Sequence, residues 1–324
     1  MATLTAKKQI DCDGPVHEGM SPALMTRLTE MCALRDAALY WSDPEGVHQM
    51  RVASRRLRGA LRDFAPHLPK RRTAASLKQI REIAVALGRV RDCDVAIATL
   101  ERTATKAPEG IAAGIRHFAQ FRETERNEGR TKLVELLTPD SLSDLTRRFE
   151  TALMPALPRS RTTRATKASK GARTGLTYRD VARSIVLTRL EELEQLSKSL
   201  YRPLKIKPLH EMRLAAKHLR YALELFEPCW GARIGFFANK VAALQSSLGK
   251  LHDCDLWIED FGETVTSGRS GPALDHRPVL VWLLAHFVKL RSKNLCEALR
   301  QWQEWEDEGF SAALRARIQA AGPV

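Results

Sequence analysis

The sequence is poor in aromatic side chains and lacks the long apolar runs of membrane and secreted proteins. Aromatic residues make up 6% of the 324 residues. β-Branched residues are sparse beside Ala, Leu, Arg and Glu, a balance that favours helix over sheet. The longest apolar run, 279–285, is far shorter than the roughly 20 residues that a membrane span needs. The N-terminal MATLTAKKQIDCDG has no apolar signal core. These absences predict a soluble, cytoplasmic protein.

No Cys-x-x-Cys pair occurs, so the spacing of a zinc ribbon is missing. In a long cytosolic chain we expect the cysteines to be reduced and to act as small buried hydrophobes. The six positions are Cys12, Cys32, Cys93, Cys229, Cys254 and Cys296.

Acidic residues are outnumbered: 52 Lys and Arg stand against 38 Asp and Glu, which gives a net charge of +14. Such a charge disfavours compaction through self-repulsion and is typical of proteins with a polyanionic partner. Composition alone leaves nucleic acid, an anionic membrane surface and polyphosphate open.

The chain contains an internal repeat with an offset of about 162 residues. VHQMRVASRRLRGALRDF (47–64) aligns with LHEMRLAAKHLRYALELF (209–226) with nine identities in 18 positions. With a one-residue slip, LGRVRDCDV (87–95) aligns with LGKLHDCDL (248–256). Each half carries a net charge of +7, because 27 basic residues oppose 20 acidic ones in 1–162 and 25 oppose 18 in 163–324. The basic bias therefore belongs to the repeated unit.

Apolar spacings of three and four predict helices throughout. We expect them near 22–40, 46–66, 71–104, 111–137, 141–153, 177–200, 208–227, 231–261, 277–307 and 309–321, with a late loop at 262–272. Asp43 and Pro44 form a helix start, as N-cap and first helical residue, and Pro208 has the same role in the second half. The predicted organisation is a tail (1–20), a first helical repeat (21–154), a basic flexible linker (155–175) and a second helical repeat (176–321).

One helix in each half carries a basic stripe beside an apolar one. At about 100° per residue, the basic side chains of 48–62 fall within about 80° of one another. They are His48, Arg51, Arg55, Arg58 and Arg62, and the second half repeats them as His210, Arg213, Lys217 and Arg220, with Glu224 in place of the last arginine. The apolar side chains of the same helix lie on another face.

The stripes work against local stability, because like charges at i,i+3 and i,i+4 cost about 0.2–0.5 kcal/mol per pair. A merely solvated face usually alternates its charges. Arginine forks bind two phosphate oxygens together and histidine can add a proton, so the stripes predict an anion site. A solvated or internally paired stripe is the alternative.

The other motifs are weaker. Arg89-x-Arg91-Asp92-x-Asp94 and Lys250-x-His252-Asp253-x-Asp255 repeat, and we interpret their acids as buried partners of arginines rather than metal ligands. No nucleophile or partner carboxylate stands at a fixed spacing from the histidines, and no Walker-type loop occurs. We therefore predict no catalytic residue, no metal and no cofactor.

The repeated segments 43–64, 87–95, 209–226 and 248–256 together resemble the CHAD family, the conserved histidine α-helical domain, over roughly residues 20–320. The resemblance implies an all-α fold of two helical bundles related by a pseudo-two-fold axis, with the basic stripes lining a central basic pore. It implies binding of inorganic polyphosphate and association with polyphosphate granules. The Glu-x-Glu-x-Lys motif of the triphosphate tunnel domain, which some members carry, is absent, so we expect a stand-alone binding module.

Carried over by position, the ligand-facing candidates are the nine stripe cations His48, Arg51, Arg55, Arg58, Arg62, His210, Arg213, Lys217 and Arg220. Further wall positions are Lys78, Arg81, Lys240, Arg27 and Arg189. Two rival functions stay open: a sequence-nonspecific nucleic-acid binder, which lacks stacking aromatics among the stripe residues, and a phosphate-processing enzyme that uses His48 and His210. We expect no membrane partner.

Overall fold

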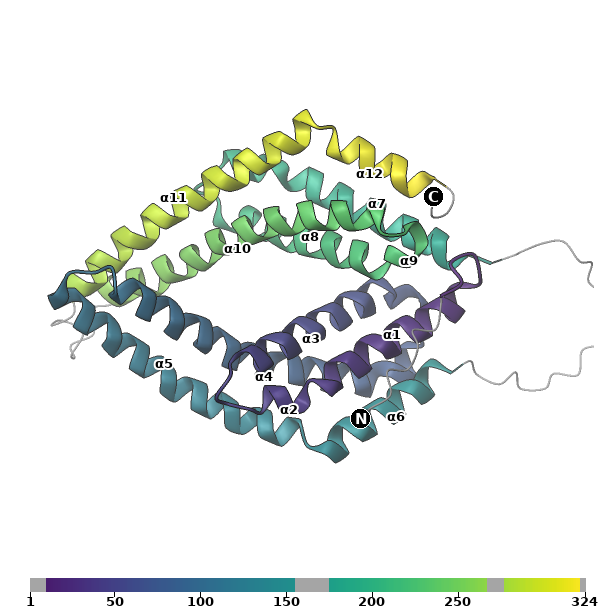
Figure 1. Ribbon diagram of the computed structural model, residues 1–324, viewed down its shortest axis with the longest axis horizontal. Helices are drawn as coiled ribbons and strands as arrows, with labels where there is room; N and C mark the ends of the chain where they lie inside the picture. The colour runs from purple at the N-terminus through teal and green to yellow at the C-terminus, as the bar shows by residue number, and fades with distance from the viewer. Residues whose placement is uncertain (1–9, 155–174, 267–276, 321–324) are drawn as a thin grey trace, which may run out of the picture. The chain divides into compact units, whose positions relative to one another are not determined.

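The computed structural model describes residues 10–154, 175–266 and 277–320, and these residues confirm the predicted all-α fold (Figure 1). Their only β-type pairing is an isolated antiparallel bridge between Pro15 and Thr177. The elements are α1 (Val16–Ala33), α2 (Arg35–Ala38), α3 (Glu45–Asp63), η1 (Ala65–His67), α4 (Lys70–Ala104), α5 (Glu109–Leu136), α6 (Pro139–Leu153), α7 (Tyr178–Leu196), η2 (Ser197–Tyr201), α8 (Ile206–Leu225), α9 (Glu227–Trp230), α10 (Arg233–Thr266), α11 (Arg277–Asp307) and α12 (Phe310–Gln319).

Helix boundaries differ from the predictions at a few ends. The carboxylate of Asp43 accepts a hydrogen bond from the backbone N–H of Glu45 at 2.8 Å, but α3 begins at Glu45 and its N-cap is Pro44, so the predicted roles of Asp43 and Pro44 are wrong by one residue. Pro208 is the third residue of α8. The first part of the predicted 262–272 loop is helical, because α10 continues to Thr266. Nearly all of the predicted basic linker, 155–174, lies outside the described residues, and α1 begins within the predicted tail.

The chain divides into two compact units that do not follow the sequence repeat. Unit 1 comprises residues 1–85 and 134–183, and unit 2 comprises residues 86–133 and 184–324. The boundaries fall within α4, α5 and α7, so each unit takes helical segments from both halves of the chain.

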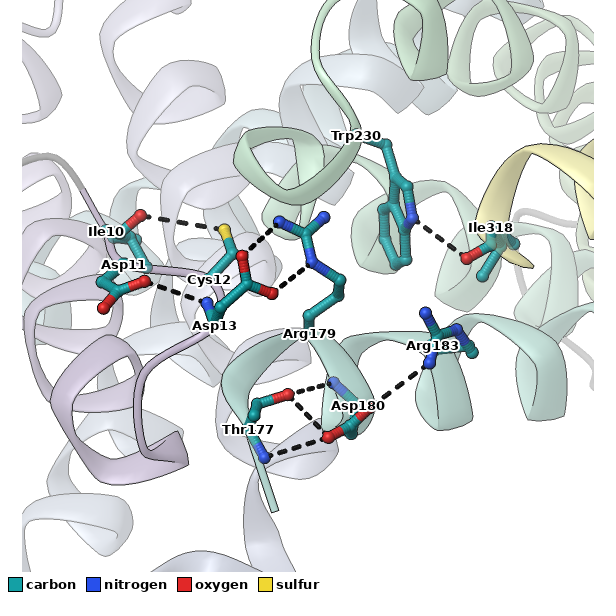
Figure 2. Close-up of polar contacts among 10 residues, drawn as sticks. All are labelled: Ile10, Asp11, Cys12, Asp13, Thr177, Arg179, Asp180, Arg183, Trp230 and Ile318. Carbon is teal, nitrogen blue, oxygen red and sulfur yellow. Dashed lines mark hydrogen bonds and ion pairs between the residues drawn. The ribbon is translucent and has the colours of Figure 1, made fainter. Parts of the chain in front are cut away.

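Unit 1 packs α3 against α1 and α2. The closest approach requires Gly46, where an added Cβ would lie 1.9 Å from the carbonyl oxygen of Ala37. The first turn of α7 is attached to the N-terminal segment (Figure 2): the backbone N–H of Arg179 donates to the carbonyl of Cys12 at 2.7 Å, and its Nε donates to Asp13 Oδ1 at 2.8 Å. The ring of the buried Tyr178 lies against Gly19.

Unit 2 contains one apolar cluster built from four helices. Leu100 on α4, Ile115 on α5, Phe261 on α10 and Leu283 and Phe287 on α11 are all buried there. In another part of the unit, Nε1 of the buried Trp230 donates to the carbonyl of Ile318 at 3.1 Å (Figure 2). The cluster therefore joins the distal part of the α4–α5 pair to the α10–α11 pair.

The burial of the cysteines agrees with the prediction at four of the six positions. Cys12, Cys93, Cys229 and Cys254 are buried and reduced as expected, but Cys32 is half-buried and Cys296 is exposed, so the expectation of six buried cysteines is wrong for these two. None of the helices within the described residues has the length and apolar character to cross a membrane.

Candidate anion-binding site

In unit 1, α3 has the two faces that its sequence predicts. The apolar stripe is buried: Met50 and Leu57 are fully enclosed, and Ala53, Ala60, Leu61 and Phe64 are buried beside them. The basic stripe remains at least partly accessible, with Arg58 exposed and His48, Arg51, Arg55 and Arg62 half-buried.

Three arginines of unit 1 lie close enough for their charges to act on one another. Arg55 and Arg58 belong to α3, and Arg81 belongs to α4. Partial desolvation lowers the pKa of Arg58, and the positive charges of Arg81 and Arg55 lower it further. Within the part of the chain that the structure describes, no carboxylate forms an ion pair with these three side chains. We call Arg55, Arg58 and Arg81 the arginine cluster.

The neighbouring cations of unit 1 are less available. Arg62 contacts the buried carboxylate of Asp63, the next residue, with 3.0 Å between Nη2 and Oδ1. Lys78, one turn before Arg81 on α4, is exposed and lies 4.0 Å from Glu82. The arginine cluster therefore differs from Arg62 and Lys78, which lie beside carboxylates.

In unit 2, the basic stripe of α8 faces α10. An added Cβ at Gly249 of α10 would lie 3.7 Å from Nε of Arg213, so the guanidinium passes over this glycine. Arg220 donates from Nε to Glu224 at 2.7 Å and from Nη1 to Gln245 of α10 at 3.5 Å. Glu224, which replaces the last arginine of the first stripe, thus neutralises its neighbour.

Two histidines meet between α8 and α10. The ring centroids of His210 and His252 are 4.2 Å apart, and their Nδ1 atoms are separated by 3.3 Å. Burial lowers the pKa of His210, and the positive charges of Arg213 and Lys217 add to the effect. Burial, Arg213 and His210 together lower the pKa of His252 to about 4. Both shifts favour the neutral form of the rings at pH 7 in the unliganded protein.

His252 lies outside the set of site residues that the sequence predicts. The signal was present, because the alignment of 87–95 with 248–256 places His252 at the position of Arg91. One half thus has an arginine where the other has a histidine, at the same position of a repeated segment.

Three predicted wall positions are bound to carboxylates. Arg27 and Arg189, which match between the repeats, pair with Glu30 at 3.3 Å and with Glu192 at 2.6 Å, each three residues along its own helix. Lys240 pairs with Glu308, and its Nζ lies 5.1 Å from the centroid of the Phe236 ring. These cations have local partners that an anion would have to displace.

One acid of each repeated motif is buried and pairs with an arginine as we interpreted it, whereas Asp92 and Asp253 are exposed, so the interpretation is wrong for these two. Asp94 is buried on α4 with Nη1 of Arg126 of α5 at 3.6 Å from its Oδ1. Asp255, its repeat equivalent on α10, is buried with Nε of Arg291 of α11 at 2.5 Å from its Oδ1. The first pair links α4 to α5, and the second links α10 to α11. In each half, the linked pair begins with the helix that follows the basic stripe, α4 after α3 and α10 after α8.

The described residues form an all-α domain. One basic stripe lies on α3 and a second lies on α8. A family model for the CHAD domain matches residues 23–260, and the chain belongs to that family. The crystal structure of the CHAD domain from the plant Ricinus communis is similar to it with a TM-score of 0.65 and 20% identity, covering 91% of this chain and 96% of that one.

A second solved structure, PptA from Streptomyces chartreusis, is similar with a TM-score of 0.63 and 14% identity, covering 90% of this chain and all of that one. At these identities the likeness shows the fold. No curated protein matches the sequence.

Proposed function

We propose that this protein binds inorganic polyphosphate through the basic stripes of α3 and α8 and associates with polyphosphate granules. The observation that carries the proposal is the arginine cluster: three guanidinium groups are held together on two helices, and none has a carboxylate partner among the described residues. Family membership agrees with it, since the resemblance to CHAD domains implies this ligand.

The physical argument is charge compensation. The charges of Arg81 and Arg55 lower the pKa of Arg58, so the three positive charges are costly to hold together, and a multivalent anion removes that cost. Guanidinium groups bind two oxygens of a phosphate with paired hydrogen bonds, and a linear polyphosphate offers such oxygens at every unit. Arg55, Arg58 and Arg81 would each contact phosphate oxygens, with Lys78 adding a point charge beside them.

We propose binding without chemistry. In unit 2 the partner of His210 is another histidine, and the cations Arg213 and Lys217 surround the pair. This environment supports holding an anion by charge and hydrogen bonds, and among the described residues no carboxylate forms a hydrogen bond with His210 or His252 that would orient either ring as a general base.

The first test compares ligands. Long-chain polyphosphate, duplex DNA and single-stranded RNA are titrated against the full chain in one buffer, followed by competition at equal phosphate concentration. We expect polyphosphate to displace both nucleic acids. Displacement of polyphosphate by DNA would overturn the proposal in favour of nucleic-acid binding.

The second test removes the arginine cluster. Arg55→Gln, Arg58→Gln and Arg81→Gln together should raise the Kd for polyphosphate by roughly 100-fold or more, since each charged hydrogen bond contributes about 1.5–3 kcal/mol. The matched control changes three exposed arginines elsewhere, Arg71→Gln, Arg116→Gln and Arg233→Gln, which removes the same charge.

The control should change the Kd only slightly. An equal loss in both triple variants would mean that net charge, rather than the cluster, attracts the ligand. Titrations at several salt concentrations add a second readout: by analogy with nucleic acids, the slope of log K against log salt should become shallower by about 0.7–0.9 per lost phosphate contact.

A further inference from the structure

The pair His210–His252 has a hydrogen-bond geometry that limits how it can carry protons. With the two Nδ1 atoms 3.3 Å apart, one Nδ1–H donates to the lone pair of the other Nδ1. The donor ring then has no proton on its Nε2, whereas the acceptor ring has one. The neutral pair therefore offers one Nε2–H donor and one Nε2 lone pair, and the lone pair repels the oxygen of an anion.

One added proton changes this arrangement without breaking it. A proton from solvent binds the bare Nε2, so that ring becomes an imidazolium, and its Nδ1–H still donates to the neutral partner. The pair then has a charge of +1 and two Nε2–H donors. A second proton would place hydrogens on both Nδ1 atoms and break their bond, so the pair takes up a single proton.

The surroundings keep this proton off in the free protein. On α8, Arg213 and Lys217 disfavour a further positive charge, and Glu211 opposes them weakly. On α11, which packs against α10, Arg291 is bound to Asp255, and Glu297 pairs with Arg300 of its own helix. On η2, which packs against α8, the charged residue is the exposed Lys198. Arg213 and Lys217 repel a metal ion between the rings and attract an anion.

We infer that the His210–His252 pair takes up one proton when polyphosphate binds, so that affinity rises as pH falls, and that His252 is a specificity-determining residue of the α8 stripe. The inference rests on the proposed function. An anion at Arg213 and Lys217 cancels the charges that keep the pair neutral, which raises its affinity for the proton. Arg91 in place of His252 gives the first half a permanent charge at the equivalent position, so the proton-linked response belongs to one stripe alone.

The test is calorimetric titration of long-chain polyphosphate into the full chain at pH 7, in two buffers of unequal ionisation enthalpy. The difference between the observed enthalpies gives the number of protons taken up. The wild type should take up close to one proton per site, and the double variant His210→Gln/His252→Gln, which removes both rings and keeps hydrogen-bonding side chains, should take up almost none. Wild-type affinity should rise by up to about tenfold per pH unit as pH falls, and that of the variant should stay nearly level.

The matched control is His286→Gln. His286 is a half-buried histidine of the same unit, stacked on Trp282, and burial and the charges of Lys106 and Lys289 lower its pKa. It should keep the wild-type proton uptake. Binding of polyphosphate by the wild type without proton uptake would overturn the inference and leave the proposed function intact.

Two other outcomes are also decisive. Equal uptake by the wild type and His210→Gln/His252→Gln would place the proton elsewhere and overturn the inference, whereas failure of the wild type to bind polyphosphate would overturn both proposals. Circular dichroism checks that each variant is folded. If His210→Gln/His252→Gln unfolds, the NMR pH titration of the histidine ring protons of the wild type, with and without polyphosphate, decides: two rings must gain a shared proton on binding.

Discussion

Asp255 and Arg291 form a buried ion pair that ties α10 to α11, with 2.5 Å between Oδ1 and Nε. The guanidinium also donates from Nη2 to the carbonyl of Pro203 at 2.7 Å, so it connects two helices and the segment before α8. The aspartate is 5% exposed, and its partner is therefore held in a largely desolvated site.

Removal of this carboxylate should destabilise the protein strongly. Asp255→Ala leaves a largely buried arginine without its counter-charge, and such losses cost about 3–5 kcal/mol. Urea unfolding measures the change in the free energy of unfolding. Glu259→Ala, at an exposed position on the same helix, is the control and should stay within about 0.5 kcal/mol of the wild type. Similar effects of the two substitutions would contradict the importance of the pair.

The repeat-equivalent Asp94 should behave differently. Burial raises the pKa of Asp94 more than the charges of Arg126, Arg130 and Arg91 lower it. An acid with a raised pKa binds its proton more tightly in the folded state. Its contribution to stability is therefore greatest below the unfolded value of about 3.9 and is lost as pH rises through the folded pKa.

Asp94→Asn should therefore gain stability relative to the wild type as pH rises from 4 to 7, and at pH 7 it should cost less than about 1 kcal/mol. Urea unfolding at both pH values measures this, with the exposed neighbour Asp92→Asn as control. A cost of several kcal/mol at pH 7 would mean that Arg126 compensates the buried charge fully.

Gly46 should not tolerate a side chain. Because an added Cβ would lie 1.9 Å from the backbone oxygen of Ala37, Gly46→Ala must push α2 away from α3. We expect a loss of at least about 3 kcal/mol, at the upper end for overpacked sites. Gly110→Ala is the control: nothing lies within 4 Å of its added Cβ on α5, and alanine should there stabilise by up to about 1 kcal/mol. Thermal unfolding of both variants gives the comparison.

Glu224→Gln should tighten the binding of polyphosphate. The substitution releases Arg220 from the carboxylate that now lies 2.7 Å from its Nε, and it removes a negative charge from the α8 stripe. We expect a Kd lower by roughly threefold to tenfold, which corresponds to about 0.7–1.4 kcal/mol. Glu191→Gln, an exposed position on α7 with the same charge change, is the control and should alter the Kd less. Equal affinities of Glu224→Gln and the wild type would exclude Arg220 from the binding site.

The helices could be predicted from the sequence because each carries its own periodic signal. Met50, Leu57 and Phe64 recur at helical spacing and are buried as expected, and Asp94 and Asp255 hold arginines as their repeated motif indicated. These features depend on residues that are near in sequence or matched between the two halves.

Contacts between distant segments could not be predicted in this way. Nothing in the sequence around Lys240 indicates that Glu308, 68 residues later, neutralises it. The pairing of His210 with His252 depends on the register of α8 against α10, which a helical wheel of one helix does not contain. The attachment of Arg179 to Asp13 likewise joins positions 166 residues apart.

The exchange of segments between the two units has a consequence for cutting the chain. Unit 1 needs Tyr178 and Arg179 from the second half of the sequence, and the apolar cluster of unit 2 needs Leu100 and Ile115 from the first half. Two fragments divided between 155 and 174 would each expose apolar surface that only the other fragment covers. We therefore expect them to be insoluble or unfolded when expressed singly and to reassemble when expressed together. The chain would then serve as a split protein whose reconstitution reports on the meeting of its halves.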